Sequence, residues 1–251
     1  MKLLATFALA PMALALSLTA CGGNGTGNTT AAAPVAATAA PAGKSWNEVV
    51  AKTDQGYVMG NPNAPIKLVE YGSRLCPTCK AFADQGFAPL TGTYVKSGKV
   101  SFEFREFLVH GPPDMAPALL GRCVGTDAFF PMLEQMFANQ TQFTDKWQAM
   151  PAAVQQQIVA APPAEAFRMW AENMGLIEFV KERGLPEAAA RTCIADQTQV
   201  DKLTKQTQDN GPGPVGNGTV TGTPTFLIDG DVAQGAITWP AVEQALKRAG
   251  A

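Results

Sequence analysis

Two cysteines separated by two residues offer the clearest chemistry in this sequence. The motif Cys76-Pro77-Thr78-Cys79 follows an expected buried strand, 66–71, which carries one acid in an apolar setting, and opens a segment with helical spacing. The thiolate is the nucleophile in thiol–disulfide exchange, and the dipole and free N–H groups of a helix N-terminus favour it. We therefore expect Cys76 to lie exposed at a helix start with a lowered pKa, where it forms a mixed disulfide. Cys79, three residues later on the same side of the helix, would resolve that mixed disulfide.

The two-cysteine motif has two other interpretations. Half of a structural zinc site would need two more ligands, and the chain has no second motif of this kind and only one histidine, His110. A plain structural disulfide would suit a secreted protein. The position of the motif, where a strand is expected to turn into a helix, favours redox chemistry over both. We expect neither a bound metal nor another cofactor.

A second motif, Gly222-Thr223-Pro224-Thr225-Phe226, stands directly before an expected strand, about 145 residues after the cysteines. Alone, a proline there would indicate only the start of a strand. Paired with the cysteine motif, it resembles the thioredoxin superfamily, in which a cis-proline loop faces the dithiol. An X-Pro bond adopts cis at a cost of only about 0.5–1 kcal/mol. The resemblance implies that Thr223 offers its backbone to an extended substrate strand and that Pro224 packs beside the two cysteines.

The elements that must position these motifs follow from the apolar pattern. Strands are expected at 56–60, 66–71, 100–107 and 225–229. Helices are expected from Ser45, over 186–208 and over 239–248. Residues 113–183 are rich in Ala, Met, Gln and Leu, have helical spacing and show no strand pattern. The chain therefore combines strands and helices, with a helical stretch between the two motifs.

The helical stretch indicates an insertion of about 75 residues. This organisation resembles the DsbA-type oxidoreductases, which insert a helical domain into the thioredoxin fold, and the segment 59–73 before the cysteines is also similar to that family. We expect an α/β protein with a thioredoxin fold and an inserted helical domain. Its parts would be 45–110, the insertion 111–185, and 186–251.

The DsbA resemblance implies a role for an acid six residues before the first cysteine. Glu70 matches this acid and would transfer a proton to the inner thiol, with a pKa raised by burial. The alternative is an acid paired with a lysine or arginine at the sheet edge. The sequence leaves both open.

One departure from the DsbA pattern affects the expected redox strength. Such oxidants usually carry Pro-His between the cysteines, whereas this chain has Pro77-Thr78. A histidine donor would stabilise the thiolate and make the disulfide more oxidising. We therefore predict a weaker oxidant, nearer the isomerase or reductase range, and Thr223 before the proline is compatible with isomerase-type relatives. The single histidine, His110, is expected at a surface or linker position and not as a catalyst.

Cys123 and Cys193 fall in two segments with helical spacing, near the two ends of the insertion. In an oxidising compartment we expect them to form a structural disulfide. Closing a loop of about 70 residues would stabilise the protein by roughly 4 kcal/mol in the chain-entropy model. Two buried free thiols are the alternative.

The first twenty residues, 1–20, are typical of a signal peptide. A positive end precedes an uncharged apolar run over 3–18, which is shorter than the ~20 residues that span a bilayer. The following Leu-Thr-Ala-Cys, residues 18–21, resembles the lipobox of bacterial lipoproteins. The resemblance implies cleavage before Cys21 and attachment of lipid to it. An ordinary signal peptide cleaved nearby is the alternative.

Residues 21–44 are expected to form a flexible, lipid-anchored linker. Between 22 and 43 there is no charged side chain and no large apolar one, so the segment cannot bury enough surface to order itself. Gly22 after the lipid site favours the outer membrane, if the source has two membranes. We therefore expect an extracytoplasmic protein that faces the periplasm and is anchored to a membrane.

The composition narrows the partners. The chain has 251 residues with 19 Lys and Arg, 21 Asp and Glu and a net charge of −2, which gives no electrostatic reason to expect nucleic acid. The predicted function is thiol:disulfide exchange with extracytoplasmic proteins that contain cysteines, together with a membrane redox partner. A reductase or isomerase of the same fold is one alternative. Another is a non-catalytic thioredoxin-like chaperone that delivers copper through Cys76 and Cys79.

Overall fold

The computed structural model describes residues 31–251. The predicted signal peptide, the predicted lipid site at Cys21 and the first part of the predicted linker lie outside the described residues. Within the described part of the chain, no helix is long and apolar enough to span a bilayer.

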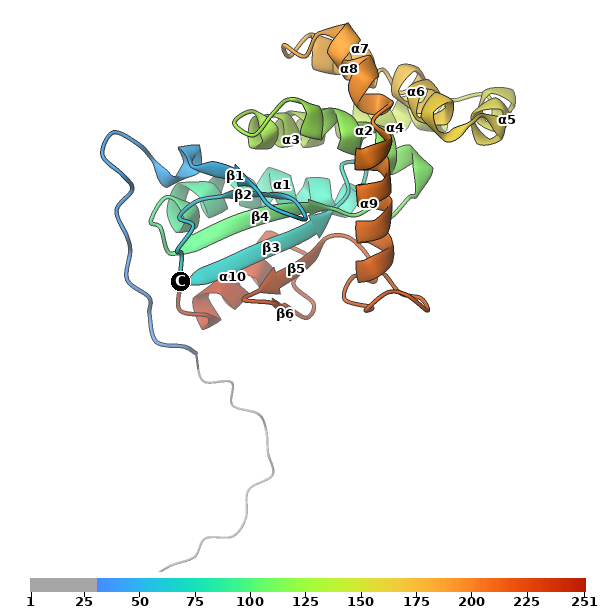
Figure 1. Ribbon diagram of the computed structural model, residues 1–251. Coiled ribbons are helices and arrows are strands. Elements are labelled where there is room, and N and C mark those ends of the chain that lie inside the picture. The colour runs from blue at the N-terminus through green and yellow to red at the C-terminus, as the bar shows by residue number, and fades with distance from the viewer. Residues whose placement is uncertain (1–30) are drawn as a thin grey trace, which may run out of the picture. The chain divides into compact units, whose positions relative to one another are not determined.

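A six-stranded sheet lies at the centre of the fold, in the order β1-β2-β4-β3-β5-β6 (Figure 1). Its strands are β1 (Val50–Lys52), β2 (Tyr57–Met59), β3 (Ile66–Gly72), β4 (Val100–Glu106), β5 (Thr225–Ile228) and β6 (Asp231–Val232). β3 and β4 are parallel, with Gly72 opposite Glu106, whereas β5 runs antiparallel to β3, with Thr225 opposite Tyr71. The ends of β3 and β4 and the start of β5 therefore meet at one end of the sheet.

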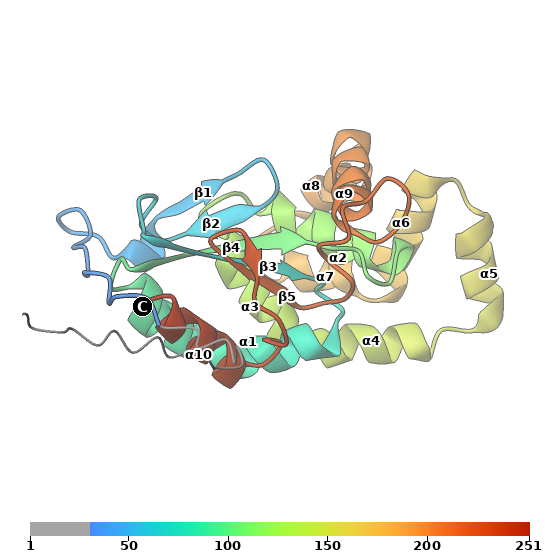
Figure 2. The same cartoon turned by 90° about the horizontal axis from the view of Figure 1, so that it is seen from below.

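Both faces of the sheet are covered, which is why β3 is almost entirely buried. α1 (Pro77–Pro89) and α10 (Trp239–Arg248) lie side by side on one face (Figure 2). There the rings of Phe82 and Phe226 pack with their centroids 4.5 Å apart. The opposite face holds a smaller cluster that includes Tyr71. The Tyr71 hydroxyl donates a 3.1 Å hydrogen bond to the side-chain oxygen of Asn210.

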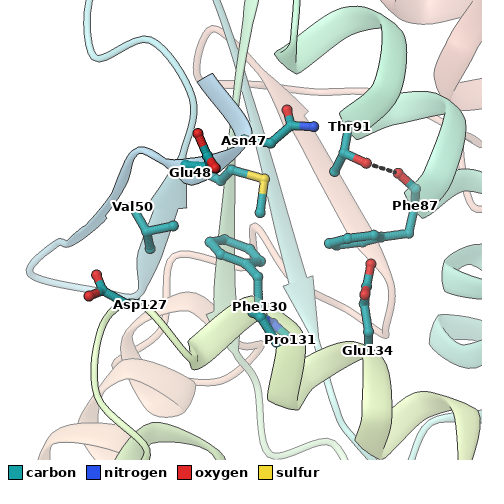
Figure 3. A pocket seen from close by; sticks show the side chains of 10 residues that line it. Asn47, Glu48, Val50, Phe87, Thr91, Asp127, Phe130, Pro131 and Glu134 are labelled. Atoms are coloured by element: carbon teal, nitrogen blue, oxygen red, sulfur yellow. Dashed lines mark hydrogen bonds between the residues drawn. The ribbon is translucent and has the colours of Figure 1, made fainter. Parts of the chain in front are cut away.

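Short elements flank the sheet near the far end of α1. The 3-10 turn η1 (Trp46–Glu48) precedes β1, and the π-helical η2 (Leu90–Val95) continues α1. A cleft of about 410 Å³ lies between these elements and the insertion (Figure 3). Phe87 and Phe130 form part of its apolar wall, and Glu48, Asp127 and Glu134 are among its lining residues.

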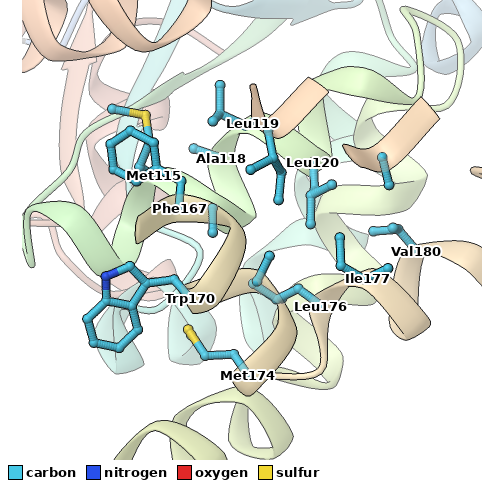
Figure 4. Packing of buried hydrophobic residues seen from close by; sticks show 14 of the residues in the cluster. Met115, Ala118, Leu119, Leu120, Phe167, Trp170, Met174, Leu176, Ile177 and Val180 are labelled. Carbon is cyan, nitrogen blue, oxygen red and sulfur yellow. The ribbon is translucent and has the colours of Figure 1, made fainter. Parts of the chain in front are cut away.

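The predicted helical insertion follows β4 and has a core of its own (Figure 4). Its helices are α2 (Pro112–Cys123), α3 (Phe129–Ala138), α4 (Gln140–Gln148), α5 (Ala152–Ala160), α6 (Pro163–Asn173), α7 (Leu176–Lys181) and α8 (Glu187–Ile194). Leu119, Trp170 and Leu176 are among the side chains buried between them. The prediction of an α/β thioredoxin fold with a helical insertion is confirmed.

The segment 186–208 differs from its prediction as one helix. It forms two, α8 and α9 (Gln197–Asn210). Asp196 causes the break, because its carboxylate accepts a 3.2 Å hydrogen bond from the backbone N–H of Gln199 and so caps α9. α8 packs against α2 and α7, so the insertion extends beyond 185, where the sequence placed its end.

Cys123 in α2 and Cys193 in α8 form a disulfide, the pairing expected from the sequence. Their Cα atoms lie 6.1 Å apart, within the usual range for a disulfide. Because 70 residues separate the two cysteines in the sequence, the bond closes most of the insertion into one loop.

Residues 31–44 differ from the expected flexible linker, because they lie along the domain as an arm. The backbone N–H of Ala32 donates to the carbonyl of Arg248 over 2.8 Å. The carbonyl of Thr38 accepts a 2.7 Å hydrogen bond from the Trp46 indole and lies against Gly98, where a Cβ atom would clash with it. Small side chains allow the backbone of the arm to approach the domain this closely and to form hydrogen bonds with it, while Val35 and Ala40 pack against the core.

Candidate active site

Cys76 is the N-cap of α1. Its Sγ accepts a 3.4 Å hydrogen bond from the backbone N–H of Cys79, and Pro77 occupies the first turn, where a missing N–H costs little. The sequence places the cysteine here because the buried strand β3 ends at Gly72 and the chain then turns into the helix. A negative charge on Sγ therefore lies at the positive end of the helix dipole.

Hydrogen bonds favour the thiolate of Cys76 and lower its pKa to about 5. The bond with the Cys79 side chain has the largest effect; burial opposes it, and Thr223 and the backbone N–H groups of Cys79 and Thr78 support it. The lowered pKa agrees with the sequence-based prediction. The predicted exposure does not, since Cys76 is only 6% exposed. The Thr223-Pro224 loop covers it.

The Thr223-Pro224 loop faces the dithiol. The peptide bond between the two residues is cis. The Thr223 carbonyl lies 3.2 Å from Cys76 Sγ and accepts a hydrogen bond from the thiol. Pairing of β5 with β3 explains the contact, because the start of one strand lies beside the end of the other. A cleft of about 330 Å³, lined in part by Pro224 and Ile237, lies along this loop, and Ile237 is 49% exposed.

Cys79 and Glu70 lie behind Cys76 in the protein interior. Cys79 is fully buried, and burial, the hydrogen bond with Cys76 and the charges of Glu70 and Cys76 raise its pKa. Burial also raises the pKa of Glu70, with further contributions from Cys76 and Glu106. Among the described residues Glu70 forms no ion pair, and its Oε1 has no hydrogen-bond partner. The sheet-edge ion pair considered for Glu70 is therefore not seen, since β3 is a central strand.

The segment just before the cysteines is held by residues that the sequence analysis did not single out. Arg74 is buried and its Nε donates a 2.9 Å hydrogen bond to the Glu106 carboxylate at the end of β4. Its guanidinium also packs against the Phe129 ring and lies where a Cβ on Gly121 would clash. The position of Arg74 just before the CxxC motif was the one sequence signal of a supporting role, but its contact partners are distant in the sequence.

Gln140, the first residue of α4, is the second such residue. Its buried side-chain amide donates to the carbonyl oxygens of Arg74 and Cys76, over 3.0 Å and 2.9 Å. A single side chain of the insertion thus satisfies two backbone acceptors around the dithiol. Nothing in the local sequence distinguishes this glutamine from the others in the insertion.

His110 lies at an exposed position in the turn between β4 and α2, in agreement with its expected surface or linker position, and the charge of Cys76 acts on its ring. It follows β4 by four residues, and its ring Nδ1 lies 3.1 Å from the Asp114 carboxylate. That hydrogen bond raises the pKa of His110 against the effect of burial, and the charges of Asp114 and Cys76 raise it further. Across residues 31–251, no cluster of three or more His, Cys, Asp or Glu side chains is arranged to hold a metal.

Comparison with known proteins relates this chain to redox proteins. Residues 52–248 match a family model described as thioredoxin. Disulfide bond formation protein D of Bacillus subtilis is 30% identical over 93 residues, which is 36% of this chain and 42% of that protein, so the match spans less than half of the relative. A crystal structure of a protein-disulfide isomerase from Novosphingobium aromaticivorans is similar with 29% identity and a TM-score of 0.71, over 77% of this chain and 97% of that one. Oxidised BdbD from Bacillus subtilis shares the fold, with 17% identity and a TM-score of 0.54 over 82% and 97% of the two chains.

Proposed function

Because this chain belongs to the thioredoxin family, we propose that it is a DsbA-type protein thiol:disulfide oxidoreductase that works through Cys76 and Cys79. The observation that supports this most directly is the contrast between the two thiols. One lies at a helix N-terminus with its pKa lowered to about 5, and the other is buried with a raised pKa. Such a pair has one good nucleophile and leaving group and one protected resolving thiol.

The exchange starts from the disulfide form when the protein acts as an oxidant. A substrate thiolate attacks Cys76 Sγ, the Cys76–Cys79 bond breaks, and Cys79 leaves with the electron pair and takes a proton from Glu70. A second thiolate of the substrate then attacks the substrate sulfur of the mixed disulfide, and Cys76 leaves as a thiolate. The substrate gains a disulfide, and the protein ends as the dithiol. The same steps in reverse reduce a substrate.

Glu70 suits the proton transfer because burial raises its pKa and so favours the neutral form, which can give up a proton. The charge of Glu70 contributes to the raised pKa of Cys79, which supports a proton transfer between the two groups. Thr223 and Pro224 suit the binding of an extended substrate segment, since their loop lies against Cys76 and beside an open cleft. The proposed substrates are therefore proteins with cysteines in extended or unfolded segments.

The redox strength proposed is intermediate. A nucleophilic thiol with a pKa of about 5 falls between about 7 in thioredoxin and about 3.5 in DsbA. Greater stabilisation of the thiolate favours the reduced protein and makes the disulfide more oxidising. A reductase or isomerase role is the second candidate, favoured by Thr78 between the cysteines and by the printed name of the similar protein-disulfide isomerase.

We propose an extracytoplasmic location with a lipid anchor at Cys21 and a membrane redox partner that restores the active disulfide or dithiol. The disulfide between Cys123 and Cys193 supports an oxidising compartment. The signal-peptide and lipobox patterns support the anchor. Metabolic labelling with a fatty acid, compared between the wild type and Cys21→Ser, tests it, and equal labelling of the two would contradict it.

Exchange with a reduced, unfolded protein tests the proposed activity. We expect the disulfide form of the wild type to introduce disulfides into this reduced protein. A disulfide-containing form of the same substrate serves for the variants: the Cys76 thiolate of Cys79→Ser should attack the substrate disulfide, release one substrate thiol and accumulate as a mixed disulfide visible on a non-reducing gel, and Cys76→Ser should form no adduct. Absence of any adduct with Cys79→Ser would contradict the proposal. Thiol trapping of Cys76 in cells then assigns the direction, because an oxidase rests as the disulfide and a reductase or isomerase as the dithiol.

A further inference from the structure

The single histidine of the chain and the nucleophilic cysteine are brought to the same end of the sheet. β3 and β4 are parallel, with Gly72 paired with Glu106. Cys76 follows the end of β3 by four residues, and His110 follows the end of β4 by four residues. Equal offsets from paired parallel strand ends place both residues above the same edge.

A chain of hydrogen bonds joins the two segments. Ser73 Oγ accepts a 3.1 Å hydrogen bond from the backbone N–H of Leu75, the residue before Cys76, and donates one of 2.7 Å to Asp114 Oδ1. The other oxygen of Asp114 accepts a 2.7 Å hydrogen bond from the backbone N–H of His110. The imidazole Nδ1 lies 3.1 Å and 3.2 Å from the two carboxylate oxygens. The ring is therefore held in place from both its backbone and its side chain.

The surroundings of the imidazole favour its charged form. The ring packs edge-on against Trp147, with centroids 5.7 Å apart, and its side chain is 32% exposed. The charged groups of the described residues that act on it are Asp114 and Cys76, and both favour the protonated ring. Asp114 is only 2% exposed, so water screens its charge poorly. Unless a positive charge offsets it, the Asp114 carboxylate would destabilise the nearby Cys76 thiolate.

We propose that protonated His110, positioned by Asp114, stabilises the Cys76 thiolate and replaces the histidine that is absent between the two cysteines. The inference rests on the proposed redox function of Cys76 and deepens it. Protonated His110 offsets the negative charge of Asp114. The electrostatic effect that remains at Cys76 Sγ is then the favourable one of the α1 N-terminus. Loss of the His110 proton would leave the charge of Asp114 uncompensated and so make the thiolate less stable.

His110→Gln tests the inference, because glutamine can still donate a hydrogen bond to Asp114 but carries no charge. We expect the pKa of Cys76 to rise by about one unit. At a pH below the wild-type pKa, the thiolate fraction of Cys76 should therefore fall about tenfold. The exchange equilibrium with glutathione should shift several-fold towards the disulfide form of the protein. The pKa is measured from the pH dependence of alkylation by iodoacetamide and from the ultraviolet absorbance of the thiolate.

Two further variants separate charge from structure. His110→Lys keeps a positive charge near Asp114 and should retain a low Cys76 pKa. Lys205→Gln removes one exposed positive charge from α9 and should leave the Cys76 titration unchanged. Thermal unfolding of each variant establishes that it is folded. A Cys76 titration in His110→Gln that matches the wild type would overturn the inference, and so would an equal shift in Lys205→Gln.

The experiment also distinguishes the inference from the proposed function. Alkylation reports the Cys76 thiolate whether or not the protein exchanges disulfides with a substrate. A pKa shift in His110→Gln together with no turnover of any thiol substrate would support the inference and contradict the function. Normal turnover of a thiol substrate together with an unchanged Cys76 pKa in His110→Gln would support the function and contradict the inference.

Discussion

The side-chain amide of Gln140 donates a 2.9 Å hydrogen bond to the carbonyl oxygen of Cys76. The same nitrogen donates to the carbonyl of Arg74, so one residue of the helical insertion holds the backbone on both sides of Leu75. The insertion is therefore part of the active-site support and not only a cover over the sheet. Arg74, paired with Glu106 in the interior, links the same loop to the end of β4.

Replacement of Gln140 should destabilise the fold around the dithiol. Gln140→Ala leaves two buried carbonyl oxygens without this donor, and we expect a loss of about 1–3 kcal/mol in the free energy of unfolding. Urea denaturation of the reduced protein measures it. Gln142→Ala serves as the control, because Gln142 is an exposed residue of the same helix that bonds only to Asn139. Equal stability of the two variants would show that the Gln140 hydrogen bonds contribute little.

Glu70→Gln should slow exchange without harming the fold. Burial raises the pKa of Glu70, so its neutral form is close in shape and charge to glutamine, but glutamine cannot exchange a proton. We expect the rate of the step that releases or deprotonates Cys79 to fall about 100-fold, the lower end of the range for general acid–base catalysis. Stopped-flow fluorescence with a reduced peptide gives the rate.

Glu134→Gln is the matched control for Glu70→Gln. Burial also raises the pKa of Glu134, but this residue lines the cleft near the far end of α1 (Figure 3). Its substitution should leave the exchange rate unchanged. If Glu70→Gln exchanged as fast as Glu134→Gln, Glu70 would have no part in the proton transfer.

The stability of the reduced protein should depend on pH through Cys76. Its pKa is lowered in the folded state from the ordinary 9.0 to about 5, so the unfolded chain binds more protons between these values. The free energy of unfolding therefore rises with pH from about 5 to about 9, and this stabilisation is lost as the pH falls through 5. It amounts to a few kcal/mol at most. Denaturation of the reduced wild type across this range should show the slope, and Cys76→Ala should lack it.

Loss of the Cys123–Cys193 disulfide should destabilise the insertion and spare the dithiol chemistry. Cys123→Ser opens a loop of 70 residues, which the chain-entropy model values at about 4 kcal/mol. Under non-reducing conditions we expect a lower Tm than for the wild type, and the Cys76 alkylation rate should not change. A Tm equal to that of the wild type would mean that the bond contributes no net stability.

The sequence alone was sufficient for the parts of this protein that depend on neighbouring residues. The buried run of β3, the helix start at Cys76 and the helical spacing of the insertion are local patterns, and each predicts its element without knowledge of distant contacts. The break at Asp196 was missed because a capping residue within a helical pattern differs little from an exposed polar one.

Tertiary structure decided which groups surround the dithiol. Ser73 and Asp114 are hydrogen-bonded although 41 positions separate them in the sequence, and Gln140 and Cys76 are hydrogen-bonded at a separation of 64. No local sequence pattern could therefore pair them. Parallel pairing of β3 with β4 brings His110 beside the active site, and pairing of β5 with β3 brings Thr223 to Cys76. The chemistry of the thiols follows from residue types a few positions apart. The electrostatic environment that tunes them exists only once the sheet is assembled, because its charges come from separate strands and from the insertion.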